Sequence, residues 1–139
     1  MRKNQKSFTT SELALVLDKN IRWAAKFAAT LLYPTKPNNK YYVWSLADVL
    51  AIIVADQMYM QNRDIAVARQ VARDLQSRLK KFVPFIMKHE YIIEITGSRV
   101  EILPECLSQR RGDRVFNTHS LYLSIKMSLR EIPSEATIE

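Results

Sequence analysis

Apolar and polar residues alternate along the first third of the chain with the spacing of short amphipathic helices. Thr9, followed by Glu12 three residues later, has the pattern of a capping box, and an apolar run comes directly after it. We therefore expect a helix over 10–17. A polar break at 18–20 separates it from a second helical pattern over 21–31. Two short helices joined by a three-residue turn are typical of a helix-turn-helix.

A turn and a third helix are predicted next. Residues 33–40 include two prolines and two asparagines, and the β-prone run 41–44 follows them. We expect these two segments to form a small β-hairpin, or wing. Ser45, with Asp48 three residues on, is placed to cap a third helix, whose apolar series indicates that it is mostly core.

Between Asp64 and Phe82, apolar residues recur with alternating spacings of three and four, which is the seam of a coiled coil. The seam covers fewer than three heptads. It therefore fits either a partner helix in a homodimer or a packing surface within the same chain. Pro84 is expected to end the helix. The seam consists of Ile65, Ala68, Ala72, Leu75, Leu79 and Phe82.

The last third of the chain changes to a period of two. The β-prone runs 91–95 and 99–103 flank Gly97 and predict a β-hairpin. The polar stretch 107–117 is expected to be a loop. Apolar and polar residues alternate strictly over 121–129, which predicts a strand, because a helix would spread these apolar side chains around its circumference.

These patterns predict an α+β fold with a winged helix-turn-helix, a long connecting helix and a small β-rich C-terminal lobe. The expected divisions are a flexible basic arm over 1–7, the winged helix-turn-helix over 8–62, the long helix over 63–83 and the β-rich lobe over 84–139. The chain has 139 residues, of which 47% are hydrophobic and 25% charged, as is ordinary for a protein with one core or two small lobes.

The positive charge lies unevenly along the chain. Residues 1–83 hold 14 Lys and Arg against 6 Asp and Glu, a surplus of +8, whereas residues 84–139 hold 7 against 8. Clustered Lys and Arg bind polyanions by releasing counterions from phosphates. The first lobe is therefore expected to meet a nucleic acid, with a membrane surface as a formal alternative. A basic protein without an anionic partner is the competing interpretation.

Several classes of site lack support in the sequence. Cys106 is the sole cysteine, and with only His89 and His119 to add, neither a disulfide nor a metal site is expected. Cys106 and His119 have no local signature of a nucleophile and its base. Glycine-rich phosphate loops are absent too, so we expect neither a cofactor nor a catalytic site, and the chain is not predicted to be an enzyme.

Two features bear on where the protein works. Its longest apolar stretches are far shorter than the roughly 20 residues needed to span a bilayer, so no segment is expected to cross a membrane, and the leading hypothesis includes no membrane partner. The basic N-terminus is not followed by the apolar core of a secretory signal. We therefore expect a cytoplasmic protein.

Basic side chains on the second predicted helix and around the wing are the candidate DNA contacts. Arg22 and Lys26 stand four residues apart on one helical face. Asn20, at the helix start, either caps the helix or approaches a phosphate. Trp23 forms an i, i+4 pair with Phe27 that serves either the core or base stacking. Lys36 and Lys40 bracket the wing turn, from which they are expected to reach phosphates.

The order of these parts resembles the MerR-like winged helix-turn-helix regulators over roughly residues 8–60. The resemblance rests on Phe8-Thr9-Thr10-Ser11-Glu12-Leu13-Ala14, Ile21-Arg22-Trp23, Leu31-Leu32-Tyr33-Pro34 and Tyr41-Tyr42-Val43-Trp44-Ser45-Leu46-Ala47-Asp48-Val49. Tyr42 stands where the family has a wing arginine, and Ala29-Thr30 stand where it has a glycine before the Leu-Leu pair.

The resemblance implies that the winged lobe binds double-stranded operator DNA, that the long helix pairs two subunits and that the C-terminal region senses an effector. The leading hypothesis is thus a dimeric, sequence-specific transcription regulator. The alternative is a protein-interaction adaptor that uses the winged-helix and β lobes without binding DNA. A further protein partner of the C-terminal lobe is left open.

Overall fold

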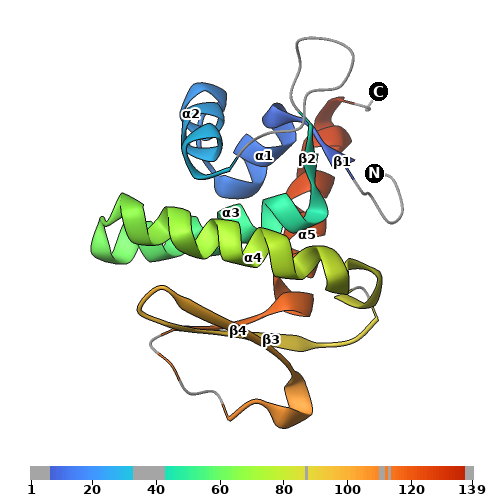
Figure 1. The fold of residues 1–139 in the computed structure, drawn as a ribbon. Helices are drawn as coiled ribbons and strands as arrows, with labels where there is room; N and C mark the ends of the chain where they lie inside the picture. Colours follow the sequence, from blue (N-terminus) through green and yellow to red (C-terminus); the bar gives the residue numbers. More distant parts are fainter. Residues whose placement is uncertain (1–6, 33–42, 87, 110–111, 113, 137–139) are drawn as a thin grey trace.

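The computed structural model describes residues 7–32, 43–86, 88–109, 112 and 114–136, with the backbone alone for 83–86 and 130–136. The fold is α+β (Figure 1). In chain order the elements are β1 (Ser7–Phe8), α1 (Thr10–Leu17), α2 (Ile21–Leu31), β2 (Trp44–Ser45), α3 (Leu46–Asn62), α4 (Ile65–Ile86), β3 (Tyr91–Thr96), β4 (Arg99–Pro104), the 3₁₀ turn η1 (Glu105–Leu107), β5 (Arg114–Asn117) and α5 (Thr118–Ala136).

Local capping fixes the first two helices, whose predicted bounds are confirmed. The Thr9 hydroxyl accepts a hydrogen bond from the Glu12 amide at 3.1 Å, and the Glu12 carboxylate accepts one from the Thr9 amide at 2.9 Å. Asp18 then adopts the left-handed conformation, with φ of 58°, and turns the chain sharply out of α1. Asn20 begins α2 as its N-cap.

α3 is the central helix, and nearly every side chain of its first three turns is buried. Its predicted cap is also confirmed, since Ser45 and Asp48 form a second capping box. The other carboxylate oxygen of the buried Asp48 accepts a hydrogen bond from Gln76 Nε2 at 2.6 Å. A helix that is apolar on all sides needs cover on all sides, and α1, α4 and α5 pack against it.

The strand β2, directly before α3, pairs with the N-terminal strand β1. Trp44 pairs with Phe8, and Ser45 with Ser7, in a short antiparallel ladder. Ser7 therefore belongs to a strand rather than to a flexible arm. The apolar side chains of Phe8 and Trp44 account for the pairing, because both are almost fully buried. The turn of the predicted wing lies outside the described residues.

α3 and α4 lie side by side along their length (Figure 1). The apolar stripe of α4 faces this contact. Ala68, Ala72, Leu75 and Leu79 are at most 1% exposed, and Ile65 and Phe82 pack against the same core. The seam is thus covered within one chain, as the packing alternative required. The prediction that it joins two subunits is wrong, because the second apolar surface that it needs is α3.

Pro84 does not end α4, which continues to Ile86. A proline inside a helix lacks the N–H group that would bond to the carbonyl four residues earlier. The helix thus runs through Pro84 with one intrahelical hydrogen bond fewer in its last turn.

A three-stranded antiparallel sheet in the order β4-β3-β5 follows α4 and lies on the opposite side of the α3–α4 pair from α2 (Figure 1). The predicted hairpin of β3 and β4 is confirmed, and Gly97 in its turn has φ of 63°. The predicted loop at 107–117 contains a strand, because Arg114–Asn117 pairs with β3. Arg114 also donates hydrogen bonds to Gln57 and Gln61 of α3, at 3.0 and 2.7 Å.

The strand predicted over 121–129 is wrong, since these residues form α5. Tyr122, Ile125 and Leu129 are buried with a spacing of three and four, whereas Leu123 and Met127 are among the exposed apolar residues. Because these two exposed side chains are apolar, the sequence alternates between apolar and polar residues as a strand does, although the segment is helical. The C-terminal region is therefore not mainly β, and α5 spans from the sheet to α1 (Figure 1).

One continuous core joins these elements. It runs from Phe8 in β1 to Leu129 in α5 without a break at residue 84. Within the described part of the chain, no helix is both long and apolar enough to cross a membrane.

Candidate nucleic-acid interface

The two faces of α2 differ sharply in burial and chemistry. Arg22, Lys26 and Ala29, at positions i, i+4 and i+7, are exposed. The opposite face is buried through Ala24, Phe27, Ala28 and Leu31. The predicted i, i+4 basic pair therefore lies on one solvent-exposed stripe, with the small side chain of Ala29 beside it.

Asn20 is exposed and caps the helix. Its Oδ1 accepts a hydrogen bond from the Trp23 amide at 2.7 Å, which is the N-cap interaction. Of the two roles considered for Asn20, capping is the one observed. The cap fixes the first turn of α2, from which Arg22 projects.

Trp23 anchors α2 instead of standing free. Its ring stacks on Phe27, with centroids 4.7 Å apart, and Phe27 lies 5.8 Å from the ring of Tyr59 on α3. Lys19 is on the turn between α1 and α2, and its Nζ lies 5.1 Å from the centre of the Trp23 ring. Of the two roles weighed for the Trp23–Phe27 pair, packing is the one observed.

Two arginines of α4 hold the other end of α2. Arg69 Nε donates a hydrogen bond to the Thr30 carbonyl at 3.1 Å, and Arg73 Nε donates one to the Leu31 carbonyl at 3.2 Å. The last carbonyls of a helix lack intrahelical donors and carry its negative dipole end, so cationic donors suit them. These contacts fix the position of α2 on the α3–α4 pair.

Sequence reasoning did not identify Arg69 and Arg73. Their i, i+4 spacing beside the buried stripe of α4 was visible, but their partners are carbonyls 39 and 42 residues away. A backbone acceptor has no side-chain signature. Only the packing of α2 against α4 brings these groups together.

One carboxyl group lies among the cations near α2. Burial raises the pKa of Asp56 on α3, while the positive charges of Lys19 and Arg63 act in the opposite direction. One of its oxygens is buried and has no hydrogen-bond partner among the residues that the structure describes. The protonated form of Asp56 is therefore favoured more than that of an ordinary surface aspartate.

A depression of about 330 Å³ opens at α2 and shares Lys26 with its exposed stripe. Tyr59 and Ile65, from α3 and α4, form one side of it. The other lining residues all come from α2, and they are Trp23, Lys26, Phe27 and Thr30.

The remaining predicted contacts, Lys36, Lys40 and Tyr42, lie outside the described residues. The structure thus brings Arg22 and Lys26 together on one face and assigns Asn20 and Trp23 to holding α2. The wing contacts stay predictions.

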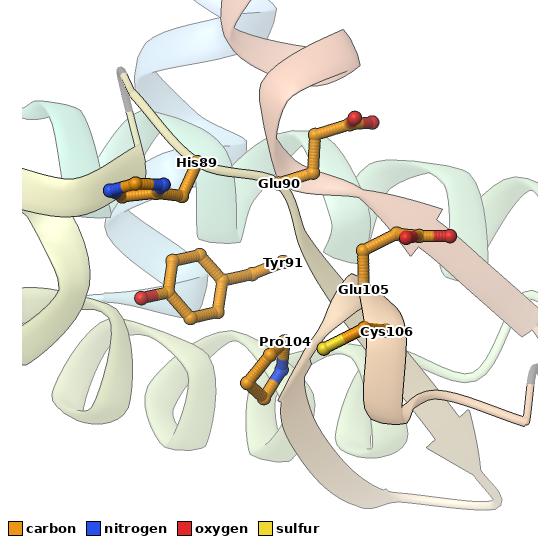
Figure 2. A pocket seen from close by; sticks show the side chains of 6 residues that line it. All are labelled: His89, Glu90, Tyr91, Pro104, Glu105 and Cys106. Carbon is orange, nitrogen blue, oxygen red and sulfur yellow. The ribbon is translucent and has the colours of Figure 1, made fainter.

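A second cavity, of about 500 Å³, lies at the far side of the molecule near the start of β3 (Figure 2). The Cys106 sulfur points toward Pro104 and the Tyr91 ring, while the Glu90 and Glu105 carboxylates point away from it (Figure 2). Glu90 accepts a hydrogen bond from Asn117 at 2.7 Å. His119 does not line the cavity, and among the described residues no group of three or more His, Cys, Asp or Glu side chains is placed to hold a metal ion.

Comparison with known proteins leaves the geometry of α2 as the main guide to function. No protein-family model matches this chain, and no curated protein matches it.

Proposed function

We propose that the chain is a sequence-specific DNA-binding regulator in which residues 8–62 form a winged helix-turn-helix, with α1 and α2 as its helix-turn-helix and α2 entering the major groove. The observation that carries the proposal is the exposed Arg22–Lys26–Ala29 stripe on a helix whose other face is buried. A helix of this kind presents long donors to base edges while its apolar face stays packed.

The support of α2 fits this role. A cap holds its first turn, an aromatic stack holds its middle and two arginines hold its last carbonyls. A groove-binding helix gains affinity when its geometry is fixed before binding, because less conformational entropy is lost on association. The side chains on the exposed stripe are then the only part of α2 that must become ordered on DNA.

The two basic residues of α2 are proposed to have different partners. Arg22, in the first turn, has a planar fork that suits the O6 and N7 atoms of guanine. Lys26, one turn later, is a point charge that suits a phosphate. Lys36 and Lys40 of the wing are proposed as further phosphate contacts, which agrees with the surplus of +8 in residues 1–83.

A homodimer remains part of the proposal, since most regulators of this kind bind two half-sites. Its interface has to lie outside the α4 seam, because the seam is covered by α3.

Selection of bound sites from random duplex DNA at physiological salt tests the proposal. A consensus that repeats as a palindrome indicates two symmetric half-sites, and one without repeats indicates a monomer. Arg22→Ala is expected to cost about 1–3 kcal/mol on the selected site and to relax preference at one base pair of each half-site. Lys80→Gln, which removes an exposed charge from α4, is the matched control and should bind as the wild type does.

The adaptor hypothesis makes the opposite prediction. An adaptor selects no consensus, and its weak affinity for duplex DNA is equally sensitive to Arg22→Ala and Lys80→Gln. That pair of results would replace the DNA-binding proposal.

A further inference from the structure

The depression beside α2 has the size and the lining of a small-ligand site. Its volume of about 330 Å³ is at the small end of the range of roughly 300–1,000 Å³ that such sites occupy. Its lining residues come from three helices, and α2 stands next to one end of the α3–α4 pair (Figure 1). The site therefore has space for a one- or two-ring molecule.

Aromatic rings form its walls and hold one another in place. Trp23 and Phe27 are stacked, with 21° between their planes, and Phe27 is tilted by 49° against Tyr59. Phe27 is only 7% exposed, so this wall cannot move without disturbing the core. Ile65 adds an aliphatic side. A planar apolar ring fits such a wall, because aromatic rings pair well in stacked and tilted arrangements.

The electrostatics of the site favour an anion. Lys26 lines the depression, and Lys19 and Arg63 lie over the Trp23 and Tyr59 rings. Two nearby carboxyl groups oppose these cations. Asp56 interacts with Lys19 and Arg63, and Asp64 accepts hydrogen bonds from the amides of Ala66 and Val67.

Lys26 is the group best placed to bind the charge. The Thr30 hydroxyl already donates to the Lys26 carbonyl at 2.8 Å, so its proton is not available to a ligand. The first amides of α4 are occupied by Asp64. One ammonium group beside an aromatic wall matches a single carboxylate attached to a ring.

We propose that this depression, formed by α2, α3 and α4, binds a small planar aromatic monocarboxylate, with the ring against Trp23 and Tyr59 and the carboxylate on Lys26. The consequence for regulation rests on the proposed function. Lys26 is also on the exposed stripe of α2, so ligand and DNA compete for one ammonium group. By thermodynamic linkage, if the ligand lowers the affinity for DNA by a given factor, DNA lowers the affinity for the ligand by the same factor.

Calorimetric titration of the DNA-free protein tests the site with 1-naphthoate. Its neutral amide 1-naphthamide and the ring-free anion acetate are the comparison probes. We expect naphthoate to bind at one site per chain, naphthamide to bind about tenfold more weakly because it lacks the charge-assisted contact, and acetate not to bind. Lys26→Gln should reduce the naphthoate affinity about tenfold and leave that of naphthamide unchanged. Lys80→Gln is the control for net charge.

Nuclear magnetic resonance locates the bound ring. The indole N–H signal of Trp23 should shift on titration. That of Trp44 should stay in place, because Trp44 is buried and its indole N–H donates a hydrogen bond to the Thr10 hydroxyl. The proposal is overturned if naphthoate does not bind, if naphthamide binds equally well, or if Lys26→Gln and Lys80→Gln have the same effect. These titrations contain no DNA, so their outcome is independent of the proposed function. Competition with a selected duplex then tests the regulatory consequence alone.

Discussion

Removal of the Arg69 guanidinium should show how strongly α4 holds the end of α2. Arg69→Met keeps most of the aliphatic stem and deletes the donor to the Thr30 carbonyl. The Thr30 carbonyl then loses its cationic donor, while Arg73 still donates to the Leu31 carbonyl. We expect α2 to lose stability at its C-terminal turn, next to the segment that leads into the predicted wing.

The size of the effect follows from the contact. A hydrogen bond that involves a charged group contributes about 1.5–3 kcal/mol. Arg69 is half-buried and its bond is 3.1 Å long, so the lower half of that range, about 1.5–2 kcal/mol, applies. Arg78 on the same helix provides the control, because its pair with Asp74 is at the surface, with side chains 50% and 35% exposed. Exposed i, i+4 pairs contribute about 0.3–0.5 kcal/mol.

Urea unfolding of Arg69→Met and Arg78→Met measures both contributions in the same background. We expect the midpoint to fall several times further for Arg69→Met, with the slope unchanged. DNA affinity should fall for Arg69→Met alone, because only that variant loosens α2. Equal losses of stability in the two variants would refute the account of how α2 is held.

Three further predictions concern packing in α5, packing in α4 and the titration of Asp56. Ile125→Ala should cost about 2–5 kcal/mol in urea unfolding and Met127→Ser less than about 0.5, because the two side chains are 1% and 65% exposed; equal costs would contradict the helical α5. Leu79→Ala should cost about 2–5 kcal/mol in urea unfolding and leave the oligomeric state by light scattering the same as that of the wild type, since a dimer lost through this substitution would return the seam to a subunit interface. The pKa of Asp56 is raised in the folded state, so the Asp56 carboxyl of the unfolded chain loses its proton at lower pH than that of the folded chain. The free energy of unfolding therefore falls as the pH rises from about 4, the ordinary pKa of an aspartate, through the raised pKa of the folded state. Asp56→Asn should therefore match the wild type in thermal melts below that window and exceed it above, and a constant difference at every pH would be inconsistent with the raised pKa.

Local signals made the first half of the fold predictable. Each of the capping pairs Thr9–Glu12 and Ser45–Asp48 is three residues apart in sequence, so the information that starts a helix is contained in one turn. The bounds of α1 and α2 were predicted to the residue for this reason. The antiparallel hairpin of β3 and β4 belongs to the same class, since Gly97 supplies the turn locally.

Long-range contacts decided what the sequence left open. Trp44 pairs with Phe8 across the N-terminal lobe, and β5 becomes a strand only because β3 offers it an edge. In α5, nothing in the local sequence distinguishes the exposed Leu123 and Met127 from apolar residues of the core. The α4 seam was a correct pattern with two possible partners, and the apolar face of α3 decided between them.

The candidate interface divides in the same way. Arg22 and Lys26 were found because helical periodicity places both on one face. Their support by Arg69 and Arg73 was not predicted, because the acceptors are main-chain carbonyls of a distant helix.

Site-specific photo-crosslinking measures directly whether the exposed stripe of α2 lies on DNA. Cys106 is the sole cysteine and is exposed, so Cys106→Ser gives a background in which a single new cysteine carries the probe. Ala29→Cys places an azidophenacyl group on the stripe, and Met127→Cys places it on the exposed face of α5. With a duplex selected by the wild type, we predict crosslinks from position 29 and none from position 127. Crosslinks from position 127 at equal yield, or none from position 29 while the duplex stays bound, would contradict the assignment of α2 as the DNA-contacting helix.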